Sequence, residues 1–191
     1  YIRGNTMGKK DAQVYYSIWS QEIKKYLQGK NRYVYMKLFL TRFEKRYSEL
    51  LTEYELADLC QLSEGNRVRP IIIISTFIYN TPLMLKGIKI EEINKIIDVC
   101  VSIEFIHKAS LILDDMIDND EARKGATAYH VKHGEKDAGI LALSLVTKAL
   151  YTLNQALISF GLSNETIRES LSISIETTYL MASSAMQELH L

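Results

Sequence analysis

The sequence predicts an all-α protein, and three observations carry that prediction. Only two prolines and nine glycines punctuate the 191 residues, which is too few for a protein of many short strands. Apolar side chains recur every third or fourth residue through most of the chain, the spacing of amphipathic helices. No repeat, low-complexity tract or linker divides the sequence. We therefore expect residues 1–191 to form a single helical domain.

Six helices are expected, separated by short polar breaks. They are residues 12–27, residues 33–60, a helix from Arg69, residues 90–118, residues 135–160 and a helix from Asn164 to beyond Met181. Breaks fall at residues 29–31 and 63–66, where glycine stands among polar residues. Residues 90–118 are apolar around nearly the whole circumference, so this helix is expected to be central and buried.

Local signals mark the ends of the later helices. Gly161 ends the fifth helix, and Ser163 is a suitable N-cap for the sixth. Residues 119–134 are interpreted as a polar loop of mixed charge. The most membrane-like stretch, residues 71–85, is interrupted by polar side chains and is shorter than the roughly 20 apolar residues that span a bilayer. We therefore expect no transmembrane segment.

Composition narrows the class of protein. The 23 basic and 23 acidic residues cancel, so the chain lacks the basic excess of proteins that hold nucleic acid. A hydrophobic content of 47% argues against a polyanionic or disordered tail protein. Two cysteines, Cys60 and Cys100, define no disulfide framework and fit a reducing compartment. We expect a cytoplasmic protein that binds no nucleic acid.

An acidic cluster closes the most apolar helix. Four of the eight aspartates lie within seven residues: Asp114, Asp115, Asp118 and Asp120. Negative charges at a helix C-terminus repel one another and oppose the helix dipole, so a bound cation would stabilise them. Asp114 and Asp118 share one helix face, and Mg²⁺ takes one or two carboxylates together with water and phosphate oxygens. The apolar run leading into the cluster favours a magnesium site over a solvated helix end.

Cationic residues flank the acidic cluster on both sides. His107 lies two turns before Asp114, on almost the same face. Taken alone, it is more readily interpreted as a satisfied core histidine than as a ligand contact. Arg123 and Lys124 follow the acids and could clamp a diphosphate. Salt bridges to the neighbouring acids are an alternative of similar weight.

Four motifs in order make the chain resemble the trans-isoprenyl diphosphate synthases, the polyprenyl synthetase family. They are Gly-Asn-Arg-Val-Arg-Pro at 65–70, Asp-Asp-Met-Ile-Asp at 114–118, Arg-Lys-Gly at 123–125 and His-Val-Lys-His-Gly at 130–134. The family carries G-G-K-R-x-R-P, D-D-x-x-D, R-R-G and H-x-x-x-G at these places. The resemblance spans about residues 42–186, the N-terminal two thirds of the family fold, and leaves residues 1–30 poorly matched.

The resemblance implies a fold, an activity and a set of site residues. The fold would be an isoprenoid-synthase helical bundle around a central apolar cavity, with its C-terminal part missing. The activity would be Mg²⁺-dependent condensation of an allylic diphosphate with isopentenyl diphosphate to a linear isoprenyl diphosphate. The implied catalytic and metal-binding residues are Asp114, Asp115 and Asp118, and the implied substrate-binding residues are Asn66, Arg67, Arg69, His107, Arg123 and Lys124. A homodimer is favoured, with a heterodimer as the alternative.

Departures from the family pattern keep two other functions open. Asn66 replaces a basic residue, which would suit a terpene synthase that ionises a prenyl diphosphate alone. The glycine-containing pairs expected later in the chain read Leu143-Ser144 and Ser184-Ala185, and the second aspartate-rich motif is absent from these residues. These changes would suit a non-catalytic subunit of a heteromeric synthase.

A final expectation concerns the length of the product. In the family, a bulky aromatic residue five positions before the first aspartate blocks the cavity. Ala109 holds that position here, with Ser110 beside it and the medium-sized Ile106 one turn deeper. The resemblance therefore predicts products of twenty carbons or more. Packing of Ala109 against a neighbouring helix is the alternative interpretation.

Overall fold

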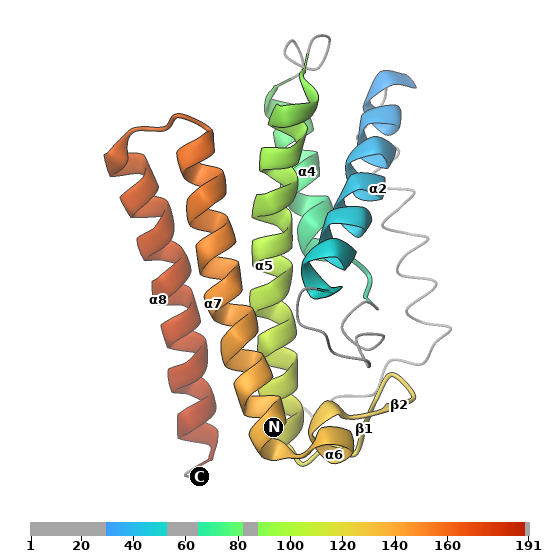
Figure 1. Cartoon of the computed structure of the whole chain (residues 1–191), viewed down its shortest axis with the longest axis vertical. Helices are drawn as coiled ribbons and strands as arrows, with labels where there is room; N and C mark the ends of the chain where they lie inside the picture. The colour runs from blue at the N-terminus through green and yellow to red at the C-terminus, as the bar shows by residue number, and fades with distance from the viewer. Residues whose placement is uncertain (1–29, 53–64, 82–87, 190–191) are drawn as a thin grey trace.

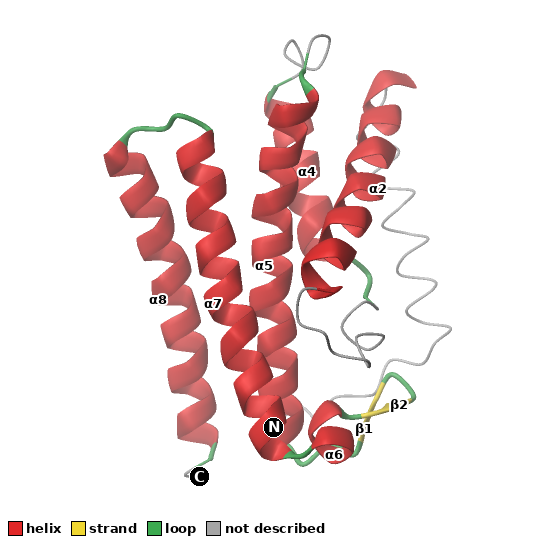
Figure 2. Ribbon diagram, viewed as in Figure 1, coloured by secondary structure: helices red, strands yellow, loops and turns green. Residues whose placement is uncertain are grey.

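A computed structural model describes residues 30–52, 65–81 and 88–189, and these residues are almost entirely helical (Figure 2). The elements are α2 (Lys30–Thr52), α4 (Val68–Asn80), α5 (Ile90–Ile117), β1 (Ala122–Arg123), β2 (Ala126–Thr127), α6 (Tyr129–His133), α7 (Glu135–Ser159) and α8 (Asn164–Glu188). The predicted all-α class is confirmed.

Helix α5 is the centre of the bundle, as its all-round apolar surface predicts. It packs against α2 and α4 on one side and against α7 and α8 on the other (Figure 1). Its buried apolar residues are Ile93, Ile97, Cys100, Val101, Phe105, Ala109 and Ile112. A helix that contacts neighbours on several sides gains hydrophobic burial around its circumference, which is why no polar face is needed over most of its length.

Helix α7 has one face that fits closely against α5. That face combines small and branched residues, among them Ala138, Leu141, Ala142, Leu145 and Ala149, which allow the two helices to approach. By length and composition α7 could cross a membrane, and 44% of its apolar window is buried inside the bundle. Residues 71–85, the most membrane-like stretch in the sequence, do not include this helix.

The boundaries of four helices lie close to the positions predicted from the sequence. Helices α4, α5, α7 and α8 begin or end within one or two residues of the expected positions, which is the usual scatter of helix ends. The predicted N-cap is confirmed, because the Ser163 hydroxyl oxygen accepts a hydrogen bond of 3.2 Å from the Thr166 amide. Helix α2 begins at Lys30, earlier than predicted, and the helix predicted at 12–27 lies outside the described residues.

The segment predicted as a loop is more ordered than expected. Residues 119–134 include the β1–β2 hairpin and the single-turn helix α6 (Figure 1). The strands are two residues long, which is too short for the alternation that identifies a strand in sequence. Together the hairpin and α6 lie beside the C-terminal end of α5, where the acidic cluster is located.

Candidate active site

The C-terminal end of α5 presents the acidic cluster in two different environments. Asp114 and Asp118 are exposed, whereas Asp115 is 5% exposed. The helix ends here because Asn119 adopts the left-handed conformation (φ 54°), and the Asp120 amide donates a 2.9 Å hydrogen bond to the Asp115 carbonyl. This is the Schellman pattern, in which a residue that tolerates positive φ reverses the chain. The exposed pair therefore faces solvent, and the buried aspartate faces the protein.

Arg123 of β1 joins the hairpin to the acidic cluster. Its guanidinium donates one hydrogen bond to Asp115 and a second, of 3.1 Å, to Asp114. Burial raises the pKa of Asp115, and Arg123 opposes that rise by stabilising the carboxylate. Burial acts to lower the pKa of Arg123, but the two aspartates outweigh it and raise the pKa. Asp115 is thus the anchor of Arg123.

The hairpin turn holds Lys124 at its tip. Ala122 pairs with Thr127 and Arg123 with Ala126, so Lys124 and Gly125 form a two-residue loop. Both have positive φ, 51° and 80°, as the type I′ turns of tight hairpins require. The turn therefore projects a cation beside the end of α5.

Cationic side chains from three elements lie near His107. Its pKa is lowered to about 4, first by burial and then by the charges of Arg69, Lys108, Lys124 and Arg123. Arg69 comes from the first turn of α4, Lys108 from α5, and the other two from the hairpin. A neutral histidine among four cations is a site suited to a strongly acidic ligand such as a diphosphate.

The remaining substrate-binding candidates, Asn66 and Arg67, differ in their exposure to solvent. Asn66 is exposed in the loop that leads into α4. Arg67 is only 7% exposed and is bonded to Glu44 of α2 and Glu104 of α5, so its guanidinium faces the protein interior. Arg67 is among the residues predicted to bind substrate, and its buried partner Glu104 was not predicted from the sequence. The signal in the sequence was the position of Glu104 inside an apolar run. A carboxylate that is buried there needs a charged partner.

The exposed aspartates suit a hard divalent cation. Among the described residues, no three acidic, histidine or cysteine side chains converge into a ready-made metal cage. Magnesium does not need one, because it commonly uses one or two carboxylates and completes its shell with water and phosphate oxygens. Asp114 and Asp118 offer two such carboxylates on one face of α5. Arg123 bonds the buried Asp115 and one oxygen of the exposed Asp114. The donor set fits Mg²⁺.

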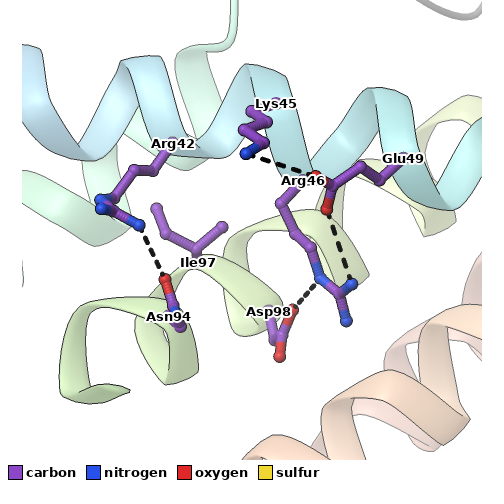
Figure 3. A pocket seen from close by; sticks show the side chains of 7 residues that line it. All are labelled: Arg42, Lys45, Arg46, Glu49, Asn94, Ile97 and Asp98. Atoms are coloured by element: carbon purple, nitrogen blue, oxygen red, sulfur yellow. Dashed lines mark hydrogen bonds and ion pairs between the residues drawn. The ribbon is translucent and has the colours of Figure 1, made fainter. Parts of the chain in front are cut away.

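Ala109 and a polar pocket occupy other parts of α5. Ala109 is fully buried, and the Ser110 hydroxyl donates a 2.8 Å hydrogen bond to the His107 carbonyl. A pocket of about 320 Å³ opens between α2 and α5 (Figure 3). It is lined by Arg42, Lys45, Arg46, Glu49, Asn94, Ile97 and Asp98. It lies about 24 Å along α5 from Asp114, so it is separate from the acidic cluster.

The chain belongs to the polyprenyl synthetase family, whose model matches residues 52–190. This confirms the resemblance inferred from the four motifs. A geranylgeranyl diphosphate synthase from Saccharolobus solfataricus is 32% identical over 118 residues, 62% of this chain and 32% of the relative. A geranylfarnesyl diphosphate synthase from Aeropyrum pernix is 36% identical over 101 residues, 53% of this chain and 29% of the relative.

A plant relative extends the comparison. The heterodimeric geranylgeranyl pyrophosphate synthase large subunit 2 from Arabidopsis thaliana is 32% identical over 140 residues, 72% of this chain and 35% of the relative. The matches span about a quarter to a third of the length of these curated relatives. No solved structure matches the chain significantly.

Proposed function

We propose that this chain provides the first metal site and the diphosphate sites of a trans-prenyltransferase that condenses an allylic diphosphate with isopentenyl diphosphate. The observation that carries the proposal is the pairing of two chemically opposite sites at one end of α5. Exposed carboxylates lie at Asp114 and Asp118, and cations surround His107 about 10 Å along the helix. Two diphosphates could then lie close together while each keeps its own counter-charges.

Each group of residues has a distinct task in this proposal. Asp114 and Asp118, with Asp115 beside them, hold Mg²⁺, which when bound would neutralise charge on the departing diphosphate. Arg123 reaches the same diphosphate from the hairpin. Asn66, Arg69, His107 and Lys124 hold isopentenyl diphosphate. With a pKa of about 4, His107 is neutral at pH 7 and can offer one N–H to a phosphate oxygen.

The reaction makes one carbon–carbon bond. The allylic C–O bond breaks and releases diphosphate, the double bond of isopentenyl diphosphate attacks the resulting cation, and a proton passes from the condensed cation to the released diphosphate. Oriented cations and a closed apolar wall would hold the reactive carbons together and exclude water. We place the chain-length control at Ala109, Ser110 and Ile106, because none of them is the bulky aromatic residue that limits the product in the family, and we expect products of twenty carbons or more. The named activities of the two archaeal relatives support this length.

The proposal is tested by product analysis. The full-length protein is incubated with MgCl₂, labelled isopentenyl diphosphate and an allylic diphosphate, and products are separated by chain length. We expect products of at least twenty carbons, abolished by Asp114→Asn. Products of only ten or fifteen carbons would contradict the proposed length. Hydrocarbon or alcohol formed from geranylgeranyl diphosphate alone would favour a terpene synthase.

A heteromeric assembly is the second candidate. The Arabidopsis relative is named as the large subunit of a heterodimeric synthase, and its similarity covers 72% of this chain. A chain that turns over substrate only after a second synthase subunit is added would support that assembly. We otherwise propose a cytoplasmic homodimer.

A further inference from the structure

The N-terminus of α4 is fastened to two other helices by one arginine. The Arg67 guanidinium donates hydrogen bonds of 2.8 and 3.1 Å to the two carboxylate oxygens of Glu44 on α2. A third hydrogen bond of 3.1 Å reaches Glu104 on α5. Bidentate pairing of this kind fixes both the distance and the orientation of the guanidinium plane. Arg67 thereby connects three helices at one point.

The surroundings of Arg67 are built to hold it. Its guanidinium carbon lies 5.4 Å from the ring centroid of Phe43 and 4.6 Å from that of Tyr47, which is in turn 5.2 Å from the ring of Phe105. Tyr47 is 1% exposed and Glu104 is 2% exposed. Stacking on aromatic faces holds the guanidinium, and burial strengthens its contact with Glu104 because water is excluded there.

The backbone around Arg67 also depends on these contacts. Arg67 has φ 51°, in the left-handed region that side chains other than glycine seldom adopt. A Cβ at Gly65 would lie 3.3 Å from the Arg67 guanidinium, 3.5 Å from Glu104 and 3.5 Å from the Lys108 ammonium. The loop therefore runs directly over a group of four charges, Glu44, Arg67, Glu104 and Lys108, whose sum is zero. Glycine fits at that approach, and the ionic contacts hold Arg67 in its strained conformation.

The four charges around Arg67 are close in sequence to the cationic residues around His107, along both α4 and α5. Along α4, Arg69 follows Arg67 by two residues and lies in the first helical turn, where the Arg67 carbonyl accepts the 3.0 Å hydrogen bond from Ile71. Along α5, His107 follows Glu104 by three residues, so both lie on the same side of the helix. The contact between residues 67 and 104 therefore sets the separation between residues 69 and 107.

We propose that Arg67 is a positioning residue. Held by Glu44 and Glu104, it places Arg69 beside His107, and it does not touch the diphosphate itself. This inference rests on the proposed function for the identity of the ligand, isopentenyl diphosphate. It assigns the two arginines of the motif at 65–70 to different tasks, with Arg67 facing the protein and Arg69 facing the ligand.

The Arg67→Lys variant distinguishes the positioning role of Arg67 from the effect of its charge. Arg67→Lys keeps the charge but loses the fork that bonds both carboxylates. We expect the KM for isopentenyl diphosphate to rise about tenfold, while the KM for the allylic diphosphate and kcat change less than about twofold. Arg46→Lys is the matched control, because Arg46 bonds Asp98 at 2.8 Å and also joins α2 to α5, away from α4. It should leave both KM values unchanged.

A second measurement does not require turnover. In Arg67→Lys, displacement of Arg69 removes a repelling charge, so the His107 pKa observed by NMR should rise from about 4 toward 6.5. Inorganic pyrophosphate, titrated against the same variant, should bind several-fold more weakly than to the wild type. If Arg67→Lys does not fold, Glu44→Gln, which alters an exposed carboxylate, should give smaller shifts of the same sign.

The outcomes are distinguishable. An unchanged His107 pKa and an unchanged pyrophosphate affinity in a folded variant would overturn the positioning role. A parallel rise of both KM values would overturn it as well, since that indicates a general loss of structure. Absence of any condensation product from the wild type would remove the proposed function but leave the NMR test of Arg67 intact.

Discussion

His107 is partly buried on α5, and its surroundings give it a pKa near 4, well below the 6.5 of a free histidine. Between these two values the unfolded chain binds a proton at this position and the folded chain does not. The contribution of His107 to the free energy of unfolding should therefore be fully present above pH 6.5 and should be lost as the pH drops toward 4. The direction follows from burial and from the four neighbouring cations, which all disfavour a charged imidazole.

We expect this dependence to disappear when the imidazole is replaced. Urea unfolding of the wild type and of His107→Gln at about pH 7 and about pH 5 isolates the contribution of this residue from that of the carboxylates. The wild type should lose more stability on acidification than the variant. Parallel losses in the two proteins would show that His107 keeps an ordinary pKa.

Other residues at this scale show what the sequence can and cannot predict. The position of Asp114 and Asp118 on one helix face followed from their spacing of four residues, because the long apolar run identified α5 as a helix and residues four apart share a helix face. The difference between Arg67 and Arg69 did not follow from the sequence. It depends on Glu44 and Glu104, which lie 23 and 37 residues from Arg67 and meet it only in the folded chain.

At the scale of elements, the β1–β2 hairpin controls two proposed ligand contacts at once. Arg123 and Lys124 come from adjacent positions of a turn that requires positive φ at Lys124 and Gly125. The sequence indicated a polar loop at residues 119–134, but strands of two residues carry no periodic signal, so the hairpin itself was not predicted. The longer helices were predicted because each contains several turns of apolar repeat.

Gly125→Ala tests the hairpin through its backbone alone. A Cβ at Gly125 would have no atom within 4 Å, so the cost comes from φ +80° and should be about 1 kcal/mol of stability. Gly139→Ala is the control: Gly139 lies inside α7, also with no atom within 4 Å, and alanine should stabilise the helix by about 1 kcal/mol. Chemical denaturation measures both, and a stable Gly125→Ala variant would contradict the role of positive φ.

At the scale of the whole molecule, α7 and α8 leave an apolar face uncovered. Exposed Ile140, Leu143, Tyr151 and Ile158 fall at helical spacing along the side of α7 that faces away from α5. Helix α8 has no buried residue and exposes Ile173, Tyr179, Leu180 and Met186. Large apolar side chains exposed on neighbouring helices often mark a contact with another chain.

The exposed side chains of α7 and α8 suit a second copy of the chain. A stable interface buries roughly 800 Å² per partner, and two adjacent helices of 25 residues each are long enough to provide an interface of that order. We therefore expect a homodimer in solution with twice the 21.9 kDa mass of one chain, measured by light scattering at micromolar concentration. Tyr151→Glu places a charge at the centre of the α7 stripe, where desolvation cannot be compensated, and should yield the monomer. Val34→Glu, at an equally exposed apolar position on α2, should leave the dimer intact. A wild-type mass of one chain at all concentrations would show that this face does not pair two copies.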